Sequence, residues 1–293
     1  MTDARQDQVD VVVAADCELG EGPVWDARSG RIVWIDIPGR RVHLHDPTTG
    51  ATESMATPLD IGAIVPRRAG GFMAALQDGF WILGDGPARR VATVPEGRPE
   101  IRFNDGKCDP QGRLWAGTMP YDEVSPVGCL YRLDRDGSVA RILDGVTISN
   151  GLAWSGDGTT MYYIDTPTRR VDAFSYDAAT GDIGDRRVAI EIPESAGWPD
   201  GMAIDVEDGL WVALWGGSAV HRYVEGRLDR VVALPVSQPT SCAFGGPNLD
   251  ELYITSAWTG LDPAARRDEP LAGGLFRIRP GVRGPAAPSY DGI

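Results

Sequence analysis

Three short segments of the 293-residue sequence each place an oxygen-bearing side chain directly before a glycine. Glu21 lies in LGEGPVW, Asn150 in ISNGLAW and Asp200 in WPDGMAI. Carboxylate and amide oxygens suit hard divalent cations. The two carboxylates would balance the charge of one such ion, and three protein ligands would leave positions open for water and substrate, as in catalytic sites. N-G and D-G pairs are also ordinary turn signals, so these segments are informative only if they occupy equivalent places in the chain.

Equivalent places are indicated by a repeat of 40 to 50 residues that runs along the sequence. The same position in the other repeats is held by Ile61 in LDIGAIV, Asp105 in RFNDGKC and Thr240 in QPTSCAF. Such a period is typical of propellers and solenoids. Carboxylates and amides that face one narrow channel would be costly to bury without a cation to neutralise them.

Five of the six repeats contain four strand-like segments separated by turns. One apolar segment recurs six times, at 31–37, 71–76, 113–119, 161–166, 210–215 and 251–257. The sixth repeat lacks a fourth strand after Ile278, and a strand-like segment at 9–16 is left over at the other end of the chain. We therefore predict an all-β, six-bladed β-propeller with four-stranded blades, the last of which is completed by the N-terminal strand.

This prediction treats residues 1–293 as a single domain, with loose termini at 1–8 and at about 281–293. The alternative is a two-domain β protein with coincidental turns, but no segment resembles a domain linker and helix is scarce. In a propeller the first strand of each blade lines the central channel. The residues that lead into these strands should therefore meet at one mouth of that channel.

Composition limits the partners and the compartment. The formal net charge of −14 disfavours nucleic acid and anionic membranes as partners. Four widely spaced cysteines indicate reduced thiols. The polar start of the chain lacks a secretory signal, and no apolar run approaches the ~20 residues that span a bilayer. We expect a soluble cytoplasmic protein, and the sequence leaves its oligomeric state open, with a monomer slightly favoured.

The motifs together resemble the senescence marker protein/gluconolactonase family, whose members are also called regucalcin-like proteins. The resemblance runs from about residue 17 onward and rests on LGEGPVW, RFNDGKCDPQGRLWAGTM, TISNGLAWS, YYIDT, PDGMAID and GLWVALW. It implies a six-bladed propeller that holds one divalent cation through Glu21, Asn150 and Asp200. Calcium is the first expectation, and Zn²⁺, Mn²⁺ or Fe²⁺ are alternatives.

The resemblance also implies the substrate contacts. In this family the Arg and Asn of RFND, here Arg102 and Asn104, contact the substrate. An acidic residue of a lid loop after GTM does the same, and Asp122 is the nearest match, with Glu123 as the alternative. The loop at 119–128 looks shorter than in animal members. Trp198, directly before the PDG motif, is a departure that would narrow the pocket.

The function implied is hydrolysis of a sugar lactone such as gluconolactone to the aldonic acid, although the sequence does not select the lactone. The metal would polarise the carbonyl group, and Asp200 would be both a ligand and the general base for water. Asp105 is as well explained by a turn before Gly106, and Lys107 is expected to point away from the site along its strand.

Three alternatives use the same fold: a calcium-binding regulator without turnover, a phosphotriesterase-like hydrolase, and a metal-free propeller similar to strictosidine synthase, which the three oxygen donors disfavour. His43 and His45 share one face of a strand but lack a third metal ligand. Ser149 and Ser241 have no channel histidine to activate them, so a Ser-His-Asp triad is not expected.

Overall fold

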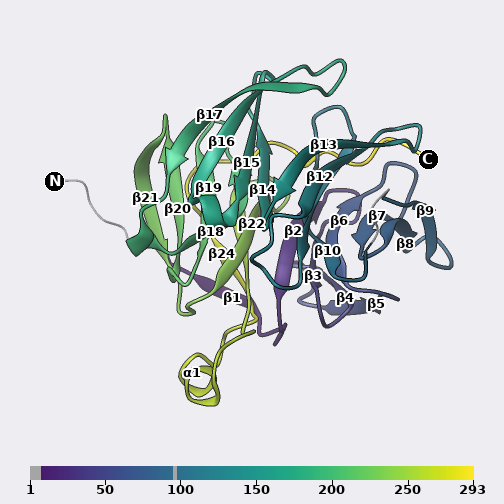
Figure 1. The fold of residues 1–293 in the computed structure, drawn as a ribbon. Helices are drawn as coiled ribbons and strands as arrows, with labels where there is room; N and C mark the ends of the chain where they lie inside the picture. The colour runs from purple at the N-terminus through teal and green to yellow at the C-terminus, as the bar shows by residue number, and fades with distance from the viewer. Residues whose placement is uncertain (1–7, 95–97) are drawn as a thin grey trace.

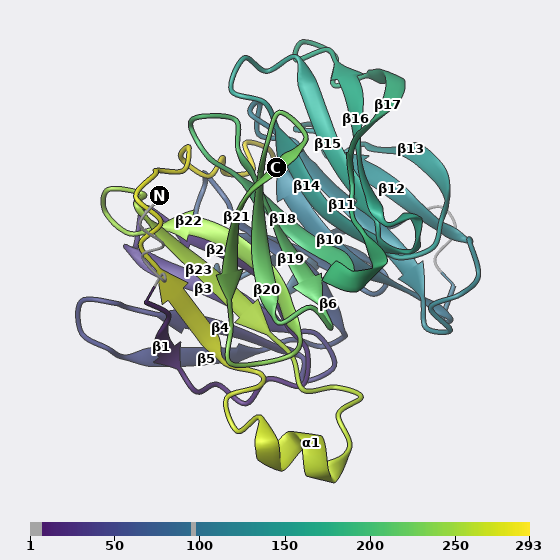
Figure 2. The same ribbon diagram turned by 90° about the vertical axis from the view of Figure 1, so that its left-hand side faces the viewer.

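A computed structural model describes residues 8–94 and 98–293, and its strands form six antiparallel four-stranded sheets arranged in a ring (Figures 1 and 2). The innermost strands are β2 (Gly20–Asp26), β6 (Ile61–Pro66), β10 (Ile101–Cys108), β14 (Ser149–Trp154), β18 (Trp198–Ile204) and β22 (Pro239–Gly245). The second strands are β3 (Arg31–Asp36), β7 (Phe72–Leu76), β11 (Leu114–Pro120), β15 (Thr160–Asp165), β19 (Leu210–Trp215) and β23 (Glu251–Ser256).

The outer half of each blade holds two more strands. The third strands are β4 (Arg41–His45), β8 (Gly79–Leu83), β12 (Gly128–Leu133), β16 (Arg170–Tyr176), β20 (Ala219–Val224) and β24 (Leu275–Ile278). The outermost are β5 (Thr52–Ala56), β9 (Arg89–Ala92), β13 (Val139–Val146), β17 (Ile183–Glu191), β21 (Arg227–Ala233) and β1 (Asp10–Val13). Helix in the described residues is limited to α1 (Pro263–Asp268) and the 3₁₀ turns Thr166–Thr168 and Glu194–Ala196.

The ring is closed by both halves of the chain. β1 pairs antiparallel with β24, so the sixth blade has the order β22-β23-β24-β1. Arg277 donates to the Asp10 carboxylate across this pair at 3.0 Å. On the inside, β22 lies against β2 as every other innermost strand lies against its neighbours. The predicted six-bladed propeller and its closure by the N-terminal strand are confirmed.

The core lies between the blades. Trp34, Trp115 and Trp211 occupy the same place in three second strands and are 0–1% exposed. The indole nitrogens of Trp115 and Trp211 donate to Asp109 at 2.9 Å and to Asp205 at 2.8 Å. The polar edge of each ring is therefore satisfied while its apolar body is buried, as the recurrence of tryptophan at this position predicts.

The C-terminal segment differs from the prediction of a loose tail. Tyr290 is fully buried, and its backbone amide donates to the Pro66 carbonyl at 2.8 Å, while Arg68 N donates to the Tyr290 carbonyl at 2.9 Å. The apolar Tyr290 ring stabilises this docking by leaving water. The prediction was wrong because one aromatic residue in a proline-rich segment has no periodicity to reveal its burial. The predicted loose N-terminus, at 1–8, falls almost entirely outside the described residues.

Two further expectations concern the whole chain. The four cysteines are buried free thiols, as their wide spacing predicts. No helix in residues 8–94 and 98–293 has the length and apolarity needed to cross a bilayer.

Every innermost strand is irregular at the same height. The pairing of each with its second strand shifts register at or next to the repeated channel position. A bulge of this kind bends a strand and re-aims a side chain. The innermost strands also approach closely here: a Cβ added at Gly62 of β6 would overlap the carbonyl group of Phe103 in β10.

We predict that Gly62→Ala lowers the free energy of unfolding by about 1–3 kcal/mol, because the added methyl group must push β6 and β10 apart. Urea titration followed by tryptophan fluorescence measures the change. The matched control is Gly184→Ala in the outermost strand β17, where the new Cβ would lie 3.2 Å from the rotatable Ser175 hydroxyl. Equal stability of the Gly62→Ala variant and the wild type would contradict close packing of the innermost strands.

Candidate active site

The polar residues of the channel meet at the end where the innermost strands begin. Asn104 in β10 donates from Nδ2 to Asn150 Oδ1 in β14 at 3.1 Å. Asn150 donates to Thr166 Oγ1 at 2.8 Å, and the Thr166 hydroxyl donates to the Pro199 carbonyl at 2.8 Å. Because Pro199 directly precedes Asp200, one hydrogen-bonded chain joins blades 3, 4 and 5 at this mouth.

Glu21 approaches the same place from blade 1. Glu21, Asp105 and Asp200 are only 3–6% exposed. Burial, followed by the charges of Asp200 and Asp105, raises the pKa of Glu21 well above its ordinary value. Burial and then Asp105 raise the pKa of Asp200 in the same way. The three carboxylates therefore interact electrostatically, although they come from three different blades.

These carboxylates lack the arginine partners that some other buried aspartates have. None of Glu21, Asp105 and Asp200 forms an ion pair with a basic side chain in the described part of the chain, whereas the equally buried Asp109 and Asp205 each pair with an arginine. Backbone amides directly after them donate to Glu21 at 2.8 Å and to Asp105 at 2.7 Å. Burying unpaired carboxylates is costly, and a bound cation would remove much of that cost.

The donor set fits a hard divalent cation. In residues 8–94 and 98–293, no group of three His, Cys, Asp or Glu side chains is arranged to hold a metal without other ligands. A cation at this mouth would therefore need amide oxygens besides the carboxylates. Asn150 Oδ1 lies beside Asn104 and supplies such an oxygen, which favours Ca²⁺ and other oxygen-preferring ions.

Arg102 is the cationic residue of the mouth. It is 7% exposed, and its Nη1 donates to Asn104 Oδ1 at 2.6 Å and to the Phe103 carbonyl at 3.1 Å. Burial lowers the pKa of Arg102, while Tyr121 and Glu123 oppose this. No hydrogen bond within the described chain uses its Nε or Nη2, so these donors remain for a substrate.

The loop between β11 and β12 brings Tyr121 and Glu123 toward the channel mouth, whereas Asp122 stabilises the loop. Asp122 is exposed, and its carboxylate accepts from the amides of Val124 and Ser125, both at 2.9 Å, which stabilises the loop itself. The Glu123 charge raises the pKa of Asp200 and that of Arg102, so Glu123 lies closer to the channel. A substrate contact by Asp122 stays a prediction, with Glu123 now the better candidate.

Tyr121 and Thr166 are site residues that sequence reasoning missed. The Tyr121 hydroxyl donates to Asp60 at 2.6 Å, and Asp60 also accepts from Arg40 at 2.8 Å, so the loop is fastened to blades 1 and 2. Thr166 follows directly after β15 in the motif YYIDT, which was a signal for it. Tyr121 carried no signal, because its partner Asp60 is remote in sequence.

Trp198 and the histidines have different surroundings. Trp198 is 40% exposed, and the Arg169 guanidinium lies 3.5 Å from the centroid of its ring. Narrowing of the pocket by Trp198 stays a prediction. His43 stacks on Trp34 with ring centroids 4.9 Å apart, and His45 hydrogen-bonds Thr52 at 2.9 Å, so both have packing roles, as expected.

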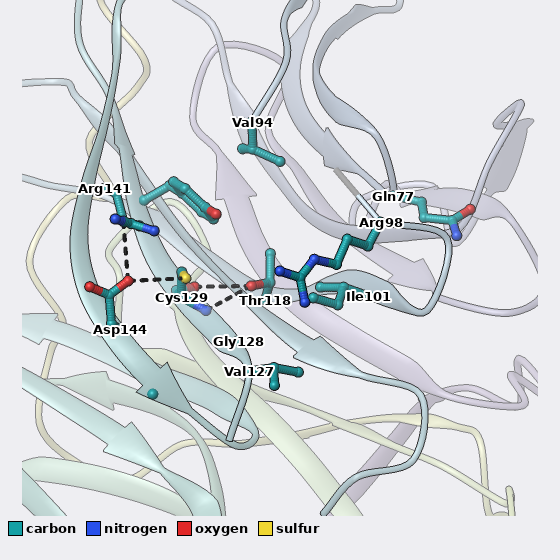
Figure 3. Close-up of a pocket in the computed structure, with 12 residues that line it drawn as sticks. Gln77, Val94, Arg98, Ile101, Thr118, Val127, Gly128, Cys129, Arg141 and Asp144 are labelled. Atoms are coloured by element: carbon teal, nitrogen blue, oxygen red, sulfur yellow. Dashed lines mark hydrogen bonds and ion pairs between the residues drawn. The ribbon is translucent and has the colours of Figure 1, made fainter. Parts of the chain in front are cut away.

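A cavity of about 240 Å³ lies away from the channel, between blades 2 and 3 (Figure 3). Figure 3 shows Arg98 reaching toward Ile101 and Thr118 on one side. On the other side, Asp144 accepts from Arg141 at 3.1 Å and from the Cys129 thiol at 3.5 Å. The cavity includes none of the repeated channel positions, so it is separate from the candidate active site.

A six-bladed propeller with a polar channel mouth is the class of protein that this fold and site define. The profile of the SMP-30/Gluconolactonase/LRE-like region matches residues 19–258, and the chain belongs to that family. Regucalcin of Xenopus laevis is 40% identical over 296 residues, which cover 97% of this chain and 99% of that protein. The Bacillus subtilis (strain 168) protein YvrE, provisionally named a sugar lactone lactonase, is 39% identical over 92% of this chain and 94% of that protein.

A solved structure is also similar over nearly the whole chain. The calcium-binding protein regucalcin from Agrobacterium tumefaciens superposes with a TM-score of 0.92 at 32% identity, and 97% of each chain is covered. The resemblance inferred from the sequence motifs is therefore confirmed at the level of the family and the fold.

We predict that the cation-free protein loses stability as the pH rises. Burial raises the pKa of Asp105 from 3.8 to about 6, so the folded state binds more protons than the unfolded state between these values. The stabilisation is complete below pH ~4 and is lost as the pH rises through about 6, by up to ~3 kcal/mol. Thermal unfolding in a chelator between pH 4 and 7.5 measures the slope.

Asp105→Asn should flatten this slope, whereas Asp268→Asn, which changes an exposed carboxylate on α1, should retain the wild-type slope. An unchanged slope in Asp105→Asn would contradict the burial of a titrating carboxyl group at this position.

Proposed function

We propose that this protein hydrolyses a sugar lactone such as gluconolactone to the aldonic acid, with one divalent cation held by Glu21, Asn150 and Asp200. The observation that carries the proposal is the meeting of buried, unpaired carboxylates with the amides of Asn104 and Asn150 at one mouth of the channel. Membership of the SMP-30/gluconolactonase family and similarity to a protein named as a sugar lactone lactonase support it.

A divalent cation bound there would polarise the lactone carbonyl group and stabilise the negative charge that develops on its oxygen. Calcium is the cation we favour, because the three side chains offer only oxygen and a relative is named a calcium-binding protein. The other residues of the mouth must then position the lactone and accept a proton from the attacking water.

Asp200 is our candidate for the group that accepts this proton. Burial and the neighbouring Asp105 raise its pKa, which makes it a stronger base than an exposed carboxylate. A cation beside it would act in the opposite direction by favouring the charged form. Lactones are reactive esters, so the weak base that results from these opposing effects is sufficient for catalysis.

Arg102 and Asn104 are our candidates for holding the sugar. Asn104 is engaged with Arg102 through Oδ1 and with Asn150 through Nδ2, which fixes the guanidinium above the mouth. The free Nε and Nη2 donors of Arg102 can then bind hydroxyl groups of the lactone ring. Positioning of this kind reduces the entropy lost in the transition state.

A calcium-binding protein without turnover is the second candidate function, because relatives are named regucalcin. It would use the same three ligands, so cation binding alone does not separate the two functions. Turnover on a panel of aldonolactones does, and a parallel panel of phosphotriesters tests a phosphotriesterase-like activity.

We predict that removal of the cation abolishes lactone hydrolysis and that one divalent ion restores it. Asn150→Ala should weaken binding of that ion by at least ~100-fold, because the variant removes one of the three proposed ligands. Calorimetric titration measures the ion, and a pH-stat measures acid release. Asn248→Ala, an exposed amide elsewhere on the chain, serves as the control. Full turnover in the cation-free wild type would overturn the proposed chemistry.

We predict that Asp200→Asn still binds the cation, more weakly, but lowers kcat by ~10²–10⁴-fold, since the amide cannot accept a proton. Steady-state kinetics at saturating cation across pH 5–9 separate kcat from KM. The acidic limb of the kcat profile should disappear in this variant. A near-normal kcat would assign the proton to another group.

A further inference from the structure

The channel contains a second chamber at the mouth opposite the candidate active site. Its volume is about 470 Å³, within the range of small-molecule sites, and about three times the ~150 Å³ cavity that accepts benzene in another protein. Its walls are mostly apolar side chains of the innermost strands and the C-terminal segment, among them Val24, Val65, Ala153, Ala203, Ala243 and Phe244.

One ammonium group faces this apolar chamber. Lys107 lies on β10, one residue beyond Gly106, and points away from the active-site mouth, deeper into the channel. Its Nζ donates to the Met202 carbonyl at 2.6 Å, and no other hydrogen bond of Nζ is made within the described chain. An ammonium group carries three donors, so two are available to a ligand.

The type of this residue is distinctive in the sequence. The chain has 28 basic residues, and Lys107 is its single lysine. Lysine presents a compact point charge on a flexible stem, whereas arginine presents a planar fork. A compact cation at the base of a narrow chamber suits one acceptor head group rather than a broad polar surface.

One residue of the chamber wall has an unsatisfied donor. Trp154 lines the chamber and is 6% exposed, and its Nε1 has no hydrogen-bond partner in the described structure. Its ring packs against Trp115 and Tyr176, with ring centroids 5.9 and 6.1 Å apart. Leaving a buried donor unsatisfied costs about 1–3 kcal/mol.

Acidic groups also line the chamber. Asp205 accepts from Trp211 Nε1 at 2.8 Å and from Arg222 Nε at 2.7 Å. Asp105 accepts from the Gly106 amide at 2.7 Å, and the Lys107 charge lowers its pKa against the effect of burial. Lys107 therefore has a neighbouring carboxylate but keeps two N–H donors without a hydrogen-bond partner in the described chain.

The C-terminal segment covers the outer end of the chamber. Residues 285–288 line it, and the backbone is fastened on both sides: Gly284 N donates to the Leu249 carbonyl at 2.9 Å, and Tyr290 N donates to the Pro66 carbonyl at 2.8 Å. Figure 1 shows this segment at the end of the molecule opposite α1, which leaves the ring between β23 and β24.

We propose that this chamber binds an amphiphilic monocarboxylate, with its apolar body against the channel wall and its carboxylate on Lys107. The site is separate from the three proposed cation ligands and does not depend on lactone hydrolysis. A charge-assisted hydrogen bond in an apolar chamber would select a carboxylate over a hydroxyl group on the same chain.

Octanoate is the probe, with octanol and octylammonium as neutral and cationic analogues of the same length. We expect one octanoate per chain, bound at least about tenfold more tightly than octanol, since a hydrogen bond to a charged group is worth roughly one factor of ten or more. Because Lys107 is the single lysine, incorporation of ¹³Cε-labelled lysine during expression marks this side chain alone, and its signal should shift on titration with octanoate.

Two variants test the location. Lys107→Met should lose about tenfold affinity for octanoate and little for octanol, and Ala243→Phe should lose both ligands by filling the chamber. Arg227→Met, which removes an exposed cation, is the control. Octanoate binding should persist in Asn150→Ala, so a failure of the cation site and a failure of the chamber remain distinguishable.

Three outcomes would overturn the proposal: no saturable octanoate binding to the wild type, equal affinity for octylammonium, or an unshifted Lys107 ¹³Cε signal at saturation. The ¹³Cε signal is measured on the unmodified wild-type chain, so the test stands even where a variant fails to fold.

Discussion

Six innermost strands line one narrow channel, and each carries a side chain to the mouth of that channel. They pack too closely there for regular strand pairing. The register shifts at the same height in all six blades, and the strands approach closely enough that a Cβ at Gly62 would overlap Phe103. A bulge re-aims the side chain beside it. Glu21, Asn150 and Asp200 all lie at these register shifts, so theirs are among the side chains that are re-aimed.

Crowding also determines the electrostatics of the mouth. Burial raises the pKa of all three carboxylates, and neighbouring negative charges raise those of Glu21 and Asp200 further, whereas Lys107 opposes the shift of Asp105. Two buried aspartates elsewhere have side-chain partners: Asp109 and Asp205 each accept from an indole and an arginine. The carboxylates of the mouth have no such side-chain partners in the described chain. We therefore interpret the mouth as a site for a bound charge, and the clusters around Asp109 and Asp205 as parts of the core.

The two mouths of the channel consequently have opposite characters. One presents oxygen acceptors, and the other presents the Lys107 ammonium group within mostly apolar walls. The loops differ accordingly. Tyr121 fastens a polar loop over the first mouth through Asp60, while the proline-rich segment that ends at the buried Tyr290 covers the second. Asp105, between them, interacts with both Glu21 and Lys107.

The sequence by itself determined the six blades, the closure by the N-terminal strand and the family, because a 40- to 50-residue repeat encodes strand order and turn positions locally. It also indicated that Glu21, Asn150 and Asp200 occupy equivalent positions. Only the tertiary structure decided which residues, remote in sequence, contact one another near these three positions. Tyr121 with Asp60, Tyr290 with Pro66 and Lys107 with Met202 are contacts between blades. Such pairings depend on how blades pack around the ring, and no local period records them.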